Sequence, residues 1–238
     1  MSVLNKIHGD LVYPRRILRL SKIIAELLPH GGRVLDVGCG DGLLSSEISK
    51  LRADVSLEGI DVLVRRNTLI AVTGFDGESI PHAEASFDVV MMVDVLHHTR
   101  DPRILLREAK RVSSLAIVIK DHTLDGPLAG PKLRLMDWVG NARHGVTLPY
   151  NYWPQAKWLA EIKALGLRLE SWEEDLALYP RWADWMFGGS LHFIARLAQV
   201  RTRSAETVSG SLGSQPPTMA DHNDPDSISS IARLRAVY

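Results

Sequence analysis

The stretch Val34-Leu35-Asp36-Val37-Gly38-Cys39-Gly40-Asp41-Gly42 constrains the fold of this chain more than any other. Its apolar first half, which carries one carboxylate at Asp36, is typical of a strand buried in a parallel sheet. The glycines at every second position then indicate a turn in which the backbone can approach a ligand closely. The stretch therefore predicts a buried strand followed by a loop that cradles a nucleotide.

The spacing of the glycines separates two kinds of nucleotide-binding turn. A dinucleotide-binding turn carries a small residue about five positions after its first glycine, and Leu43 occupies that position here. An NAD-dependent dehydrogenase is therefore the least expected function, and we expect no binding of NAD.

The turn resembles the first motif of the class I S-adenosylmethionine-dependent methyltransferases, in which Gly-x-Gly-x-Gly follows a strand that carries an acid. The resemblance extends over residues 30–200. It implies S-adenosylmethionine (SAM) as the cofactor. It also places the following residues of the first motif at the cofactor: Asp36, Gly38, Cys39, Gly40 and Gly42.

Two further loops are predicted to contact the cofactor. The apolar segment 55–61 ends in Asp61, which is placed to accept hydrogen bonds from a ribose, with Val62 beside it. Asp61 could instead cap a following helix. In the resembling family an acid in the next loop accepts a hydrogen bond from the adenine amino group, and this implies that role for Asp76, next to Gly77. An ordinary Asp-Gly turn is the alternative.

A third loop follows the apolar segment 87–93, which is typical of a central strand. Asp94 and His97 come next, and the resemblance implies that they border the sulfonium and the acceptor pocket. Because the carboxyl ends of parallel strands meet at one edge of a sheet, we expect all of these residues to form one site.

A general base is needed only if the acceptor must lose a proton. The candidates are His97, His98, Asp121, His122 and His144. We favour His122, with His97 as a second choice, because His122 directly follows the predicted fifth strand, residues 115–119, on the pocket side. Each histidine taken alone is more often a capping or surface residue.

The predicted architecture is a Rossmann-like, doubly wound α/β fold. It has a seven-stranded, mostly parallel sheet with an antiparallel last strand and helices on both faces. Residues 1–200 form the methyltransferase domain, beginning with a helical segment at 1–29, and residues 201–238 form a disordered tail.

Segments 123–153 and 173–189 are predicted inserts on the substrate side, and they are rich in aromatic residues. These rings could line a pocket for a flat or greasy acceptor, or they could pack the inserts onto the sheet edge. The aromatic residues in or beside the inserts are Trp138, Tyr150, Tyr152, Trp153, Tyr179, Trp182 and Trp185. A polar island at Asn141, Arg143 and His144 could bind a carboxylate or remain an exposed loop.

Composition narrows the class of partner. Lys and Arg balance Asp and Glu at 28 each, which disfavours nucleic acid. The single cysteine excludes an intrachain disulfide, and we predict no metal site. We expect a cytoplasmic protein, since no signal peptide or membrane span is visible. The basic residues Arg15, Arg16, Arg19 and Lys22 could touch a membrane, but a solvated outer helix face is more common.

The sequence thus predicts a SAM-dependent methyltransferase for a small-molecule acceptor of aromatic or lipid-like character. A non-catalytic, cofactor-binding scaffold of the same fold is one alternative, and a nucleic-acid methyltransferase is a weaker one. The acceptor, the methylated atom and the oligomeric state stay open.

Overall fold

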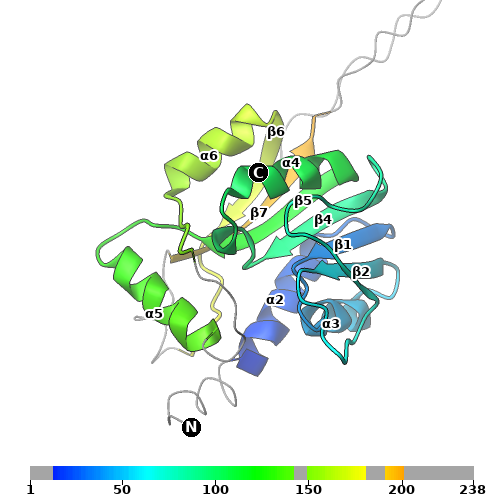
Figure 1. Cartoon of the computed structure of the whole chain (residues 1–238), viewed down its shortest axis with the longest axis horizontal. Helices are drawn as coiled ribbons and strands as arrows, with labels where there is room; N and C mark the ends of the chain where they lie inside the picture. Colours follow the sequence, from blue (N-terminus) through cyan, green and yellow to red (C-terminus); the bar gives the residue numbers. More distant parts are fainter. Residues whose placement is uncertain (1–12, 142–148, 181–190, 201–238) are drawn as a thin grey trace, which may run out of the picture. The chain divides into compact units, whose positions relative to one another are not determined.

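The computed structural model describes residues 13–141, 149–180 and 191–200. The strands within these residues are β1 (Arg33–Val37), β2 (Ser56–Asp61), β3 (Val72–Gly74), β4 (Phe87–Val93), β5 (Ser113–His122), β6 (Leu167–Glu173) and β7 (His192–Gln199). In this part of the chain they form one seven-stranded sheet in the order β3-β2-β1-β4-β5-β7-β6 (Figure 1). Strands β1 to β5 are parallel, and β7 runs antiparallel to β5 and β6. The predicted architecture is therefore confirmed.

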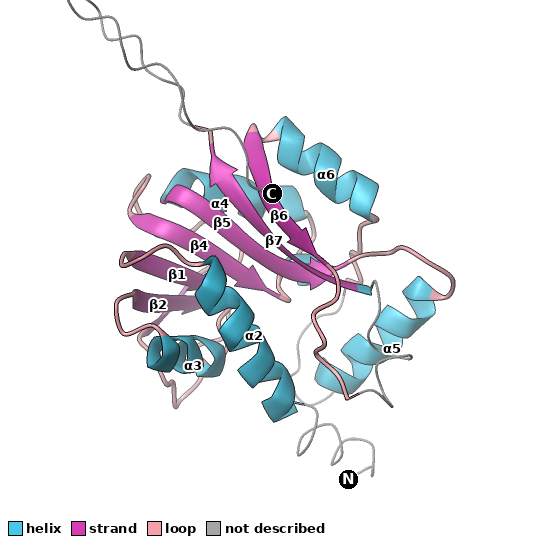
Figure 2. Ribbon diagram, turned by 180° about the vertical axis from the view of Figure 1, so that it is seen from behind, coloured by secondary structure: helices cyan, strands magenta, loops and turns pink. Residues whose placement is uncertain are grey.

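Helices cover both faces of this sheet. The described helices are α2 (Tyr13–Leu27), α3 (Leu43–Leu51), the short 3-10 helix η2 (Leu96–His98), α4 (Pro102–Val112), α5 (Ala129–Asn141) and α6 (Gln155–Ala164). Helices α2 and α3 lie on one face, and α4 and α6 lie on the other (Figure 2). Helix α5 lies beyond the carboxyl ends of the central strands (Figure 1).

The central strands are apolar because both of their sides are covered. On β4, Val89 and Met91 pack with α2 and α3, whereas Val90 and Met92 pack with α4 and α6. All four side chains are fully buried. This explains a nearly continuous apolar run in place of the alternation that a half-exposed strand would show.

Strand β5 is longer than the predicted segment 115–119. Its last residue, His122, pairs with His192, the first residue of β7, so the antiparallel partner extends β5 to this point. His122 is therefore the last residue of the strand, and the prediction that it follows the strand is wrong.

Within the predicted helical segment 1–29 the structure has a helix at Tyr13–Leu27, but the basic face of this helix is not uniformly solvated. Arg15 and Lys22 are exposed, whereas Arg16 turns inward to form an ion pair with Asp94. Arg19 donates a hydrogen bond from Nε to the carbonyl oxygen of Leu176 at 3.2 Å. Part of this face therefore binds the body of the protein.

Candidate active site

The turn between β1 and α3 has a backbone conformation that favours glycine. Gly38, Gly40 and Gly42 have φ angles of 75°, 62° and 77°. A methyl group on Gly38 would lie 2.5 Å from Val95 Cγ2, and one on Gly42 would lie 2.5 Å from Ile70 Cγ1. The turn is thus held both by its dihedral angles and by close packing.

The two predicted acids of this region do different things. The carboxylate of Asp61, at the end of β2, accepts the N–H groups of Gly40 and Leu63, each at 2.8 Å. Asp36 is buried and accepts the Ser45 hydroxyl at 2.6 Å, and burial raises the pKa of its carboxyl to about 7. Asp61 therefore faces the glycine turn, whereas Asp36 of β1 holds α3 through its hydrogen bond with Ser45.

Cys39 fills the space beneath the turn. Its side chain packs so closely on Gly59 of β2 that any larger residue at position 59 would collide with it. Burial raises the pKa of the Cys39 thiol far above its ordinary value. The side chain is therefore a neutral packing group at neutral pH.

Two further residues predicted at the cofactor, Val62 beside the ribose acid and Asp76 at the adenine, lie in neighbouring loops. Asp76 Oδ1 accepts the N–H groups of Glu78 and Ser79 at 2.8 and 2.7 Å, which is the geometry of an Asx turn. Val62 is 64% exposed. A methyl group added to Gly77 would lie 3.1 Å from Val62 Cγ1, so the two loops face each other closely.

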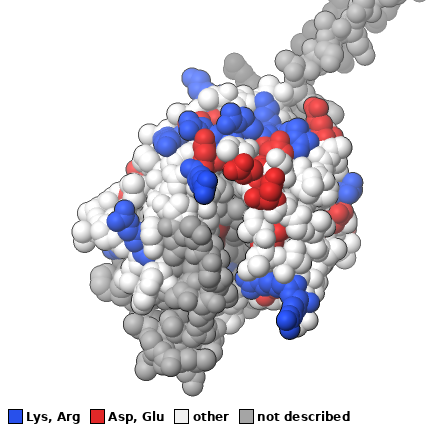
Figure 3. Space-filling view, viewed as in Figure 1, with Lys and Arg blue, Asp and Glu red and all other residues white. Residues whose placement is uncertain are grey.

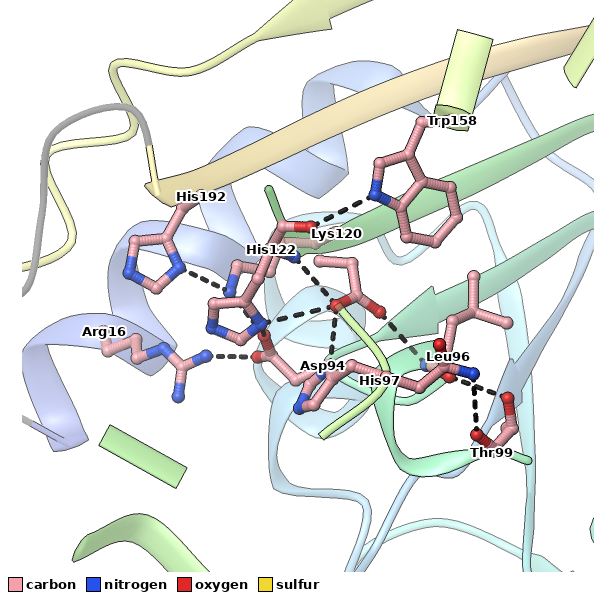
Figure 4. A network of polar contacts seen from close by, with 11 residues as sticks. Arg16, Asp94, Leu96, His97, Thr99, Lys120, His122, Trp158 and His192 are labelled. Atoms are coloured by element: carbon pink, nitrogen blue, oxygen red, sulfur yellow. Dashed lines mark hydrogen bonds and ion pairs between the residues drawn. The ribbon is translucent and has the colours of Figure 1, made fainter. Parts of the chain in front are cut away.

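Asp94 lies in a network of ion pairs at the end of β4 (Figure 4). Its carboxylate pairs with Arg16 of α2 and with the fully buried Lys120 of β5, whose Nζ also lies 3.1 Å from His192 Nδ1. Burial alone would raise the pKa of Asp94, but the two cations hold it well below its ordinary value. Burial lowers the pKa of Lys120 to about 8 against the opposing effect of Asp94.

A second buried cluster lies next to this network. Oδ1 of Asp121 is 2.6 Å from His97 Nδ1 and 3.3 Å from His122 Nδ1 (Figure 4 shows both histidines). Burial alone would raise the pKa of Asp121, but the charge of His97 and hydrogen bonds from both histidines lower it. Burial, with the nearby Lys120 charge, lowers the pKa of His122 to about 4, so its imidazole is neutral at pH 7.

Several side chains of these two clusters were not predicted from the sequence. Arg16 was assigned to a solvated surface, and neither Lys120 nor His192 was singled out. One signal was available: Lys120 directly follows the apolar run of β5, where a charge needs a partner. The identity of that partner depends on contacts between residues far apart in the chain.

The aromatic residues of the first insert divide between the two expected roles. Trp153 is buried against Trp158, with ring centroids 4.8 Å apart. The Tyr152 ring stacks on His97 at 5.6 Å and meets His122 at 5.9 Å, whereas Trp138 is 60% exposed. Packing thus accounts for Trp153, while Tyr152 borders the histidine cluster.

Some predicted residues fall outside this description. They are the side chain of Asn141, together with Arg143, His144, Trp182, Trp185 and the segments 1–12 and 201–238.

Charge is mixed on the face that carries α4. Lys and Arg side chains lie beside Asp and Glu side chains there (Figure 3), including the pairs Arg103–Asp101 and Arg111–Glu108. Among the described residues, no helix is both long enough and apolar enough to cross a bilayer.

A family model described as a methyltransferase domain matches residues 8–171. The chain belongs to this family. The sequence-based assignment to the SAM-dependent methyltransferases is therefore confirmed, and SAM is the cofactor that the family implies.

Relatives with given activities match a shorter region. The ubiquinone biosynthesis O-methyltransferase of Xanthomonas axonopodis pv. citri is 36% identical over 102 residues, which are 38% of this chain and 42% of that protein. The 27-O-demethylrifamycin SV methyltransferase of Amycolatopsis mediterranei is 30% identical over 109 residues, 40% of each chain. The chain thus spans about two fifths of the length of these relatives.

A solved structure agrees in fold. The SAM-dependent methyltransferase from Aquifex aeolicus superposes with a TM-score of 0.55 at 20% identity, covering 84% of this chain and all of that one.

Proposed function

We propose that this protein transfers the methyl group of SAM to an oxygen atom of a small-molecule acceptor. The observation that carries the proposal is the neutral imidazole of His122, buried at the carboxyl end of β5 between the Asp121 and Asp94 carboxylates. An acceptor hydroxyl must lose a proton as it is methylated, and a neutral imidazole can take it. The O-methyltransferase relatives support the choice of oxygen.

The residues around the glycine turn fit SAM. The turn at Gly38 and Gly40 brings the backbone close to a ligand without a side chain between them. Each oxygen of Asp61 accepts one N–H group and has a second lone pair, which leaves it able to accept ribose hydroxyls. Bound SAM would supply a methyl group on a positively charged sulfur that leaves as a neutral thioether.

The remaining residues predicted to contact SAM lie at the same edge of the sheet as the glycine turn. Val62, Asp76 and Gly77 would surround the adenine at the rim. Asp94 would border the sulfonium through its backbone, because Arg16 and Lys120 already hold its carboxylate.

His122 would move the proton. Both carboxylates face its Nδ1, at 3.3 Å for Asp121 and 3.9 Å for Asp94, so Nδ1 carries the hydrogen and Nε2 the lone pair. Among the described residues, no hydrogen bond reaches Nε2 of His122. A pKa of about 4 makes this imidazole a weak base, so it would take the proton only as the acceptor oxygen bonds to the methyl group, and would then release that proton readily.

The test combines binding with turnover. Calorimetric titration should show binding of SAM and S-adenosylhomocysteine and no binding of NAD. Transfer of labelled methyl from SAM should then be measured over a panel of phenols, hydroxyquinones and macrolide alcohols. For an acceptor that is methylated, His122→Asn should lower the rate about 100- to 1,000-fold with unchanged SAM affinity. The exposed His30→Asn serves as the matched control and should have no effect.

The outcomes separate the alternatives. Binding of SAM without transfer to any acceptor favours the non-catalytic scaffold, and a folded protein that binds neither adenosyl ligand contradicts the proposal altogether. Transfer to an RNA or DNA probe in place of the small molecules would favour the nucleic-acid methyltransferase, which the mixed surface charge disfavours.

A further inference from the structure

One buried carboxylate joins η2 to the end of β5. Oδ1 of Asp121 faces the Nδ1 atoms of His97 and His122 and also accepts the backbone N–H of His122 at 2.8 Å. Oδ2 accepts the backbone N–H of Leu96 at 3.0 Å. The side chains of Asp121 and His97 are each 1% exposed, and that of His122 is 5% exposed. The two backbone donors fix the carboxylate, and the carboxylate in turn fixes the rings.

This arrangement determines which ring nitrogen carries the hydrogen. An ionised carboxylate can only accept, so an imidazole nitrogen that faces it is the donor. Nδ1 of His122 therefore holds the hydrogen, and the lone pair of the neutral ring is on Nε2. Trp158 holds the backbone of His122 in place, because its Nε1–H donates to the carbonyl oxygen of this residue at 3.1 Å.

We infer that Asp121 is a positioning residue that acts through His122, selecting the ring form that presents the Nε2 lone pair to the acceptor hydroxyl. The inference rests on the proposed function of His122. Asp121 itself takes no proton, because its oxygens already accept hydrogen bonds from two backbone N–H groups and two rings.

Asp121→Asn tests this assignment with little change of shape. An amide NH₂ group in the place of Oδ1 would face His122 Nδ1 and favour the ring form with the hydrogen on Nε2, although the backbone N–H of His122 would then lose the acceptor that it has in the wild type. We expect methyl transfer to fall about 1,000-fold with SAM affinity unchanged. The matched control is Asp88→Asn at the opposite end of the sheet, where the carboxylate accepts Arg33 N–H at 2.8 Å and Ser114 Oγ at 3.2 Å. That variant should keep the rate.

Two readouts distinguish positioning from a merely structural role. Nitrogen-15 NMR of His122 should show protonated Nδ1 in the wild type and a shift toward protonated Nε2 in Asp121→Asn. In a His122→Asn background, Asp121→Asn should lower the remaining rate less than about threefold, because the residue through which it acts is gone. Losses that multiply in the double variant, or an unchanged ring form, would overturn the inference.

The NMR readout does not need turnover, so it separates this inference from the proposed function. If the wild type methylates no acceptor, the proposed function is refuted. If the His122 ring form nevertheless changes on going from the wild type to Asp121→Asn, the positioning role stays intact. If Asp121→Asn does not fold, Asp121→Glu replaces it: the longer carboxylate should keep protonated Nδ1, and protonated Nε2 in that variant contradicts the inference.

Discussion

The two halves of the site are held together in different ways. On the β1–β2 side, a backbone turn forms the site: Gly38 and Gly42 occupy left-handed conformations, and the Asp61 carboxylate accepts the N–H of Gly40. On the β4–β5 side, the site is formed by side chains from distant parts of the chain. Arg16 reaches Asp94 across 78 positions, and Lys120 reaches His192 across 72.

This difference determines how each half should respond to substitution. A backbone turn fails when a side chain blocks it, which affects ligand binding first. A buried network of charges fails when one charge loses its partner, which affects the stability of the whole domain first. The following experiments test whether the halves separate in this manner.

Asp94→Asn should produce the largest loss of stability, about 3 kcal/mol in the free energy of unfolding. Lys120 would stay fully buried without the carboxylate that contacts its Nζ. Lys120→Met leaves Asp94 paired with Arg16, so its loss should be about 1 kcal/mol or less. Urea unfolding followed by tryptophan fluorescence measures both. Equal losses would mean that the charges are not coupled as the structure places them.

Gly38→Ala should act on the other half. Because the new methyl group would lie 2.5 Å from Val95 Cγ2, the turn must shift, and we expect SAM affinity to fall at least about 100-fold by calorimetry. Gly126→Ala is the matched control: its φ is also positive, at 93°, but nothing lies within 4 Å of the added methyl group. It should lose stability through backbone strain and keep its affinity. Equal affinity losses would contradict the role of the turn.

The same division decides what could be predicted from sequence. The glycine turn and β4 were predicted because their signals are local. The start of α4 has a signal of the same kind, since the Asp101 carboxylate caps this helix ahead of Pro102. The inward turn of Arg16 could not be predicted, since nothing near it in sequence indicates Asp94 as its partner. The true end of β5 depends on pairing with β7, which is also a long-range contact.

One buried group from each half, His122 and Asp36, should respond to acid in opposite directions. His122 has a folded-state pKa of about 4, below its unfolded value of about 6.5, so its contribution to stability is lost as the pH falls from 6.5 to 4. Asp36 has a folded-state pKa of about 7, above its unfolded value of about 3.9, so its contribution grows as the pH falls from 7 to 4.

Urea unfolding at pH 7.5 and pH 5 compares the wild type with His122→Asn and with Asp36→Asn. On going from pH 7.5 to pH 5, the free energy of unfolding of His122→Asn should rise relative to that of the wild type. That of Asp36→Asn should fall relative to the wild type. Each effect is at most about 1.4 kcal/mol per pH unit. Shifts of the same sign in both variants would refute the assigned environments.

The smallest expected effect concerns Asp76, where the two roles predicted from sequence are still separable. Oδ1 already accepts two backbone N–H groups of the turn, and an asparagine oxygen can do the same, so Asp76→Asn keeps the turn. If the carboxylate also accepts the adenine amino group, SAM affinity should fall about three- to tenfold. Asp101→Asn, which keeps the cap of α4, is the control. An unchanged SAM affinity would assign Asp76 to the turn alone. Adenine would then be held by Val62 and by backbone groups, which also form the glycine turn in this half of the site.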